Sequence, residues 1–183
     1  EAKKDDVYVE VALQYNTDYN ENILSFANNV RTPEGGTHLT GFSSAITRAA
    51  NDYAKRKNRL KPDDTNMKSE DVKEGIAAVV SVKLSEPQFE GQTKAKLGNS
   101  EVRGIVDSVV NEAFSQFLEE HPQIGMLIID KCIKSQQARE AARKAREMIR
   151  RKTSLENAAL PGKLADCSET DPSKCEIFLV EGD

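Results

Sequence analysis

Nine residues near the start of the chain, VYVEVALQY (7–15), place an apolar side chain at every second position. Successive side chains of a β-strand point to opposite faces, so this spacing gives one apolar face. The residues on that face are Val7, Val9, Val11, Leu13 and Tyr15. The same alternation recurs in GIAAVVSVKL (75–84). A strand with one apolar face must cover it with a second layer, which restricts the chain to a layered fold.

Two segments with helical periodicity can supply that second layer. In the first, about 38–57, apolar residues recur at steps of three and four, and Thr37 is a candidate N-cap. In the second, 100–120, the apolar residues form one stripe, and Glu101 lies favourably near the helix start. ILSFANNV (23–30) predicts a further strand. Strands backed by helices on one side predict an α+β fold, a two-layer α/β sandwich.

A long basic helix is predicted to follow and to end near Lys152. MLIIDKCI (126–133) is interpreted either as a strand or as the first turns of this helix. Residues 131–152 carry nine Lys or Arg against two Glu, a local charge of +7 in a chain of net charge −4. Steps of four, three and four place four guanidinium groups on one helix face: Arg139, Arg143, Arg146 and Arg150. Such a stripe suits the phosphates of DNA without reading base sequence, and a solvated helix face is the alternative.

A polar loop in FEGQTKAKLGNSEVR (89–103) separates the third strand from the second patterned helix. It presents an amide, a hydroxyl and two ammonium groups: Gln92, Thr93, Lys94 and Lys96. Such groups suit an anion, but the loop has neither a Walker A nor a GxGxxG pattern. The residues alone leave anion binding and a solvated turn both open.

The other residues capable of site chemistry give weaker indications. Glu181 and Asp183 follow the apolar run EIFLV (176–180), where acids at a strand end can hold Mg²⁺, and an ordinary loop is the alternative. Three cysteines without a CxxC pair predict a reducing compartment and no zinc site. His38 is expected to be a structural hydrogen-bonding residue. No apolar run reaches membrane-spanning length, which predicts a cytoplasmic protein that contacts no membrane.

Six segments, in this order, resemble the family of the bacterial DNA gyrase B subunit and its sister in topoisomerase IV. They are GGTHLTGF (35–42), EGIAAVVSVK (74–83), QTKAKLGNSEV (92–102), AREAARKAREMIRRK (138–152), LPGKLADC (160–167) and LVEGD (179–183). The likeness implies that residues 1–153 form a transducer domain. Its fold would be a mixed four-stranded sheet backed by helices, with a left-handed βαβ crossover, followed by the long basic helix. Residues 154–183 would be a linker and the first strand of a truncated Toprim domain.

The resemblance also implies roles for individual residues. Gln92 and Lys94 would reach the γ-phosphate of ATP held by an upstream ATPase domain of the same chain, with Lys94 as the catalytic residue. The arginine stripe would contact double-stranded DNA, and Glu181 would be a Mg²⁺ ligand. The intact enzyme would use ATP and Mg²⁺ and would join the gyrase A subunit in an A2B2 heterotetramer. This chain is expected to be a piece of that enzyme, inactive alone and holding neither cofactor.

Two alternatives stay open beside a supercoiling gyrase associated with the chromosome. One is the topoisomerase IV B subunit, which decatenates DNA; Asp171–Pro172 within LADCSETDP (164–172) favours gyrase. The other is a non-enzymatic DNA-binding module that uses the basic helix. Lys94 discriminates between a topoisomerase and such a module, because only a topoisomerase gives this lysine a role in ATP turnover.

Overall fold

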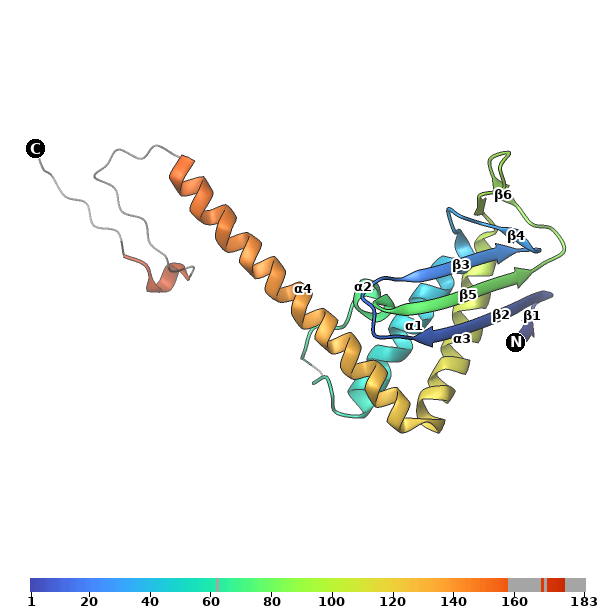
Figure 1. Ribbon diagram of the computed structural model, residues 1–183, viewed down its shortest axis with the longest axis horizontal. Helices are drawn as coiled ribbons and strands as arrows, with labels where there is room; N and C mark the ends of the chain where they lie inside the picture. The colour runs from blue at the N-terminus through green and yellow to red at the C-terminus, as the bar shows by residue number, and fades with distance from the viewer. Residues whose placement is uncertain (62, 158–168, 170, 177–183) are drawn as a thin grey trace, which may run out of the picture. The chain divides into compact units, whose positions relative to one another are not determined.

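The structure is a computed structural model that describes residues 1–61, 63–157, 169 and 171–176 (Figure 1). Its contacts divide the chain into two compact units, Glu1–Arg139 and Glu140–Asp183. The first unit contains the sheet, and each unit is described by itself below.

A mixed five-stranded sheet in the order β1-β2-β5-β3-β4 forms one layer of the first unit. The strands are β1 (Ala2–Lys4), β2 (Val7–Tyr15), β3 (Asn22–Ala27), β4 (Val30–Arg31) and β5 (Ile76–Lys83). β2 runs antiparallel to β5, and β3 runs parallel to it. The predicted alternation of β2 and β5 is confirmed, because Val9 lies opposite Val82 and both are buried. One face of the sheet therefore carries the apolar side chains that the helices cover.

Two strands, β1 and β4, were not predicted by the sequence pattern, and the resemblance implied four strands where the structure has five. Both extra strands follow from tight turns whose central residues have positive φ. Asp5 and Asp6 turn β1 into β2, and Asn28 and Asn29 turn β3 into β4. Asn and Asp tolerate this backbone region better than most residues. The predicted strand 23–30 was therefore wrong at its end, where the chain reverses.

Helices α1 (Thr37–Arg56) and α3 (Ser100–Glu120) form the second layer, and α2 (Ser69–Lys73) is a short helix before β5. The buried side chains of α1 include Phe42, Ile46 and Tyr53, none of which is exposed. In Figure 1 the strands lie in front of both helices, and β3 lies above β5 with the same direction. The connection from β3 through α1 to β5 is therefore the left-handed crossover that the resemblance implied.

Helix α4 (Pro122–Asn157) includes the segment 126–133, so the strand interpretation of that segment was wrong. Within the first unit, α4 buries Ile129 and Cys132. Within the second unit, every residue from 141 to 150 is exposed. The second unit also contains a short 3-10 helix at Pro172–Lys174. In the part of the chain that the structure describes, no helix combines the length and apolarity needed to cross a membrane.

Candidate functional site

The polar loop singled out in the sequence forms the tip of a small hairpin made by β6 (Phe89–Glu90) and β7 (Lys96–Leu97). The two strands pair antiparallel, with Phe89 opposite Leu97. The hairpin rises above β3 and β4 in Figure 1. Gln92, Thr93 and Lys94 are exposed at its tip. The structure therefore brings the predicted amide and ammonium groups together on one projecting turn.

Lys94 occupies an unusual backbone position at this tip. Its φ of 53° lies in the left-handed region, which residues other than glycine rarely adopt without support from their surroundings. Its ammonium lies 5.9 Å from the centre of the Phe89 ring, and no acidic partner is found for it among the described residues. Lys96 differs, because its Nζ lies 2.9 Å from Glu90 Oε2. Lys94 is thus the cation of the hairpin available to an external anion.

The base of the hairpin is fixed by buried groups. Asn99, only 3% exposed, accepts a 2.7 Å hydrogen bond from Gln88 N and donates one of 3.2 Å to Glu86 O. Its Nδ2 also donates to Glu101 Oε1 at 2.8 Å. Hydrogen bonds from the backbone of Glu101 and then from Asn99 hold the pKa of that carboxyl below its usual value. The sequence pattern does not indicate this role of Asn99, because the backbone partners of its side chain lie 11 and 13 residues away in the chain.

His38, at the start of α1, is buried and forms a 3.2 Å contact from Nε2 to Thr32 Oγ1. Burial lowers the pKa of its imidazole to about 4, so the ring is neutral near pH 7. Thr32 Oγ1 lies 2.8 Å from Ser25 Oγ, which links α1 to β3. This environment agrees with the expected structural role and places His38 away from solvent. The expected N-cap was wrong, because Gly36 occupies that position and Thr37 makes no side-chain cap bond.

The four arginines of the predicted stripe do not share one environment. Arg139 forms a bidentate ion pair with Asp71, with distances of 2.7 Å from Nε and 3.0 Å from Nη2. The Asp71 side chain is only 1% exposed, so this pair is a structural tie between α2 and α4 within the first unit. The sequence did not indicate it, because 68 residues separate the partners.

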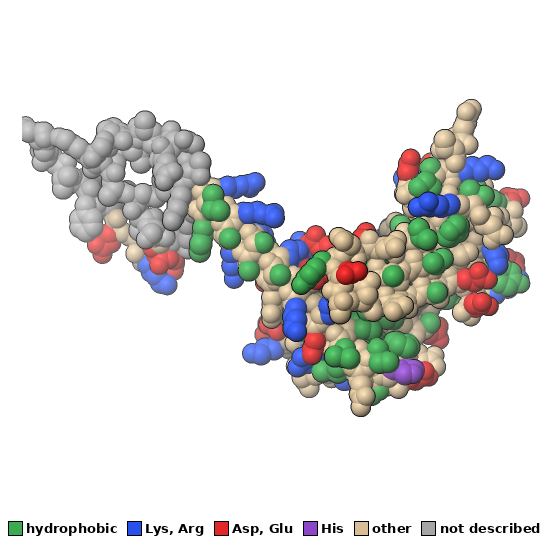
Figure 2. All heavy atoms as spheres, in the orientation of Figure 1, with side chains coloured by type: hydrophobic (Ala, Val, Ile, Leu, Met, Phe, Trp, Pro, Cys, Tyr) green, Lys and Arg blue, Asp and Glu red, His purple; other side chains and the backbone are tan. Residues whose placement is uncertain are grey.

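The remaining stripe arginines, Arg143, Arg146 and Arg150, are exposed in the second unit. In Figure 2 the Lys and Arg side chains of this length of α4 project from its flanks, with apolar side chains between them. Met148 and Ile149 are 68% and 64% exposed. Arg143 lies 3.8 Å from Glu147, a weak exposed pair. These three arginine side chains can therefore reach a polyanion.

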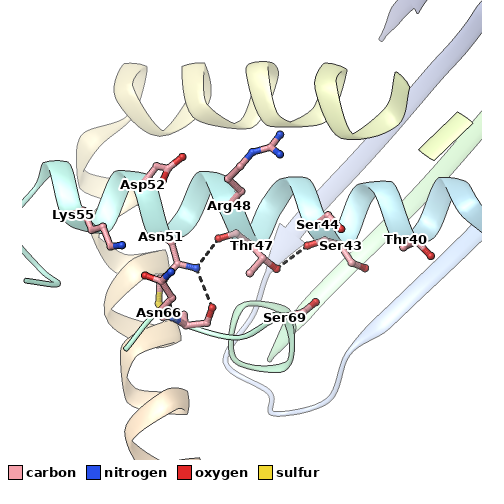
Figure 3. A pocket seen from close by; sticks show the side chains of 11 residues that line it. Thr40, Ser43, Ser44, Thr47, Arg48, Asn51, Asp52, Lys55, Asn66 and Ser69 are labelled. Carbon is pink, nitrogen blue, oxygen red and sulfur yellow. Dashed lines mark hydrogen bonds between the residues drawn. The ribbon is translucent and has the colours of Figure 1, made fainter. Parts of the chain in front are cut away.

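A groove of about 570 Å³ runs along α1 and is lined mainly by hydroxyl and amide side chains (Figure 3). Its central residue, Asn51, donates hydrogen bonds of 2.9 Å to Thr47 O and to Met67 O. Asn51 Oδ1 also accepts one of 2.8 Å from Met67 N. Arg48, at its rim, is paired with Asp107 at 2.9 Å. The polar groups of this groove thus hold the segment before α2 against α1.

The predicted metal ligand, Glu181, lies outside the described residues, as do Asp183 and most of the run 176–180. In the described ranges no group of three or more His, Cys, Asp or Glu side chains could hold a metal ion. Cys132 is buried, and that burial raises the pKa of its thiol to about 12, which keeps it protonated.

Comparisons with known proteins agree on one family. The sequence profile of the DNA gyrase B family matches residues 1–148. The chain is 65% identical to the DNA gyrase B protein of Clostridium acetobutylicum over 175 residues, which is 96% of this chain and 28% of that protein. It is 57% identical to the DNA gyrase B protein of Halalkalibacterium halodurans, over 100% of this chain and 29% of that protein. The chain thus spans less than a third of the length of these relatives.

Two solved structures, of a gyrase B and of a topoisomerase IV, are also similar to this chain. The 43K ATPase domain of Thermus thermophilus gyrase B, in complex with an aminocoumarin, matches with a TM-score of 0.72 and 46% identity, over 80% of this chain and 39% of that one. The topoisomerase IV ATP-binding domain of Francisella tularensis matches with a TM-score of 0.67 and 30% identity, over 75% and 38%.

Proposed function

The chain belongs to the DNA gyrase B family, and on that basis we propose that it works within the ATPase subunit of an ATP-dependent type II DNA topoisomerase. Residues 1–153 would be its transducer domain, and residues 154–183 a linker and the start of the Toprim domain. The transducer would couple ATP binding and hydrolysis to the passage of one DNA duplex through another.

One observation carries this proposal: Lys94 stands exposed, without an acidic partner among the described residues, at the tip of an anchored hairpin. An ammonium held in this way suits a phosphate presented by another domain. Gln92, exposed on the same turn, can donate a second hydrogen bond. Together these two residues would hold the γ-phosphate of ATP. ATP hydrolysis transfers this group to water.

The interaction free energy of this contact decides whether it can switch the orientation of two domains. Two unit charges about 4 Å apart interact by roughly 4 kcal/mol at an effective dielectric constant of 20, before desolvation is subtracted. A net gain of about 2–3 kcal/mol would shift a two-state domain orientation about a hundredfold. Hydrolysis removes the γ-phosphate and with it this gain. The hairpin would thereby stabilise the transferring phosphoryl group and report the nucleotide state.

DNA would be contacted by the arginine stripe, chiefly by the exposed Arg143, Arg146 and Arg150, since Arg139 is held by Asp71. Glu181 would contribute to a Mg²⁺ site completed by residues beyond this chain. The other partners would be the upstream ATPase domain and a gyrase A subunit in an A2B2 assembly, acting on the chromosome in the cytoplasm.

A gyrase is favoured over a topoisomerase IV as the source of this chain. The two curated relatives named above, 65% and 57% identical over at least 96% of this chain, are both gyrase B proteins. Negative supercoiling would then be the activity of the whole enzyme.

The test compares Lys94→Ala with Lys96→Ala in the full-length protein, with steady-state ATP turnover as the readout. Lys96 is the matched control, because it lies on the same hairpin but is paired with Glu90. We expect Lys94→Ala to lower turnover at least about tenfold, a loss of about 1.4 kcal/mol or more, and Lys96→Ala to stay close to the parent. A folded Lys94→Ala protein with unchanged turnover would leave the hairpin as a solvated turn and favour a DNA-binding module without a nucleotide role.

A further inference from the structure

The return strand of the hairpin, β7, is held on both sides. On one side it pairs with β6. On the other side, Leu97 N donates a 3.1 Å hydrogen bond to Gly35 O, and Glu34 N donates one of 3.0 Å to Ala95 O. Gly36 and Leu97 form a parallel bridge at the same place. The segment 34–36 thus acts as a third strand beside the hairpin.

Gly36 is the closest point of this contact. A Cβ atom at this position would lie 2.4 Å from Leu97 O and 2.5 Å from Leu97 N. Its φ of 136° lies in a region that residues with a Cβ rarely adopt. Backbone atoms cannot swing aside as a side chain can. The close approach of the two backbones therefore requires glycine at position 36.

The same residue also begins α1. Gly36 is its N-cap, and Gly36 O accepts hydrogen bonds of 3.0 Å from Thr40 N and 3.1 Å from Thr40 Oγ1. Since α1 is packed into the core, Gly36 joins the hairpin to a core helix.

Lys94 lies only three residues before Leu97, a strand length of about 10 Å. The intervening chain is not free, because Ala95 is 8% exposed and Leu97 is fully buried. A displacement of Leu97 is therefore transmitted to the tip. Relieving the clash of a Cβ at Gly36 with Leu97 O needs a shift from 2.4 Å to at least 3.0 Å. A misplacement of about 1 Å at a reacting centre can cost about a hundredfold in rate.

We propose that Gly36 is a positioning residue for Lys94: it lets the hairpin dock directly on the start of α1 and so fixes where the lysine stands. The inference rests on the proposed function, because it concerns the placement of the lysine that meets the γ-phosphate. It assigns to Gly36 a part in ATP turnover that requires no contact with nucleotide.

The experiment measures kcat and KM for ATP in the full-length protein carrying Gly36→Ala, Lys94→Ala or both. Gly35→Ala is the matched control. It places the same methyl group one residue earlier, at a φ of 71°, where the nearest atom is the movable Leu39 Cδ2 at 2.9 Å. We expect Gly36→Ala to lower kcat at least about tenfold with KM changed less than about threefold, and Gly35→Ala to have a much smaller effect. The double variant is expected to be no slower than Lys94→Ala alone, because both changes remove one interaction.

Three results would overturn the inference. A folded Gly36→Ala protein with parental kcat would do so while leaving the proposed function intact, provided that Lys94→Ala is slow. Additive losses in the double variant would show that Gly36 acts elsewhere. Parental turnover of Lys94→Ala would remove the proposed function and the positioning role together.

Should Gly36→Ala fail to fold, as judged by the loss of cooperative thermal unfolding, Ala95→Gly replaces it. This change loosens the link between the docked strand and Lys94 without any new contact. A fall in kcat of at least about threefold, absent from the Lys94→Ala background, supports the inference, and an unchanged kcat overturns it.

Discussion

The hairpin 89–97 and the exposed length of α4, residues 141–150, both present cations to solvent, but they hold them differently. The hairpin offers one ammonium, without an acidic partner in the described ranges, on a backbone fixed by buried Ala95 and Leu97. On α4, no residue from 141 to 150 is buried, and only the helix repeat spaces the arginines. The hairpin is therefore built to place one charge at one point, and the helix to offer a line of charge.

This difference matches the two anions proposed. A γ-phosphate is a single group, and its recognition depends on the position of the lysine that meets it. Duplex DNA carries about one charge per 1.7 Å of its axis, so a helix that shifts along it finds another phosphate. Arg143 and Arg150 are separated by about 10 Å at 1.5 Å per residue. Anion binding by the hairpin is therefore expected to depend mainly on the position of its one charge. DNA binding by the helix is expected to depend mainly on the number of its charges.

Arg139 belongs to the first unit and pairs with a buried carboxylate, so its loss is expected to cost more stability than that of any other stripe arginine. Arg139→Ala leaves the carboxylate of Asp71 buried without its partner, which is expected to lower the free energy of unfolding by about 3–4 kcal/mol. Arg143→Ala, on the exposed length, is expected to change it by less than about 0.5 kcal/mol. Urea denaturation of the 183-residue chain measures both. Equal losses would break the division of α4 into a packed and an exposed part.

Acid is expected to lower the free energy of unfolding of the first unit through protonation of His38. Its folded pKa of about 4 lies below the ordinary value of 6.5, so the unfolded chain binds the proton first. This contribution to stability is fully present above pH 6.5 and is lost as pH falls towards 4, up to about 3 kcal/mol. The comparison of the parent with His38→Gln in urea denaturation from about pH 7 to about pH 4.5 isolates it. The same pH dependence in both proteins would mean that His38 ionises freely in the fold.

Exchanging lysine for arginine, or arginine for lysine, tests whether the hairpin and α4 depend on the shape of the cation or on its charge alone. Lys94→Arg keeps the charge but replaces a compact ammonium by a longer planar group, so ATP turnover of the full-length protein is expected to fall about tenfold. Arg146→Lys is expected to change DNA affinity less than about twofold. A parental rate for Lys94→Arg would show that charge alone matters at the tip.

The smallest expected effects are those of single arginines on DNA binding. Each phosphate contact adds about 0.9 to the slope of log K against log salt concentration, so each single change to Ala at 143, 146 or 150 should lower the slope by about 0.9. The triple variant should lower it by about 2.7. Lys57→Ala is the control, because Lys57 is paired with Glu119 at 2.8 Å. A triple variant with the parental slope would place the DNA contact elsewhere.

The parts of the fold predicted from the sequence were those with a long repeating pattern. The alternation in 7–15 and 75–84 and the stripe in 100–120 gave β2, β5 and α3 with nearly the right bounds. The sequence pattern did not predict the strands of two or three residues, because such strands follow from turn geometry and are too short to show periodicity. The apolar segment 126–133 was ambiguous, since a short apolar run fits a strand and a buried helix equally.

For the candidate site, too, local features were predicted from the sequence and long-range contacts were not. Gln92 and Lys94 were proposed as site residues from residue type and resemblance, and the structure places both on one exposed turn. What supports that turn was missed, because it depends on pairs far apart in the chain. Gly36, the N-cap of α1, meets Leu97 across about 60 residues. Local pattern carries no information on such pairings.

Lys94 is proposed to distinguish ATP from ADP through the γ-phosphate. The most direct measurement is the equilibrium affinity of the full-length protein for a hydrolysis-resistant ATP analogue and for ADP, with and without Lys94→Ala. The proposed contact predicts that the variant binds ADP as the parent does, and that the preference for the analogue over ADP falls at least about tenfold, or about 1.4 kcal/mol. An unchanged preference would contradict it.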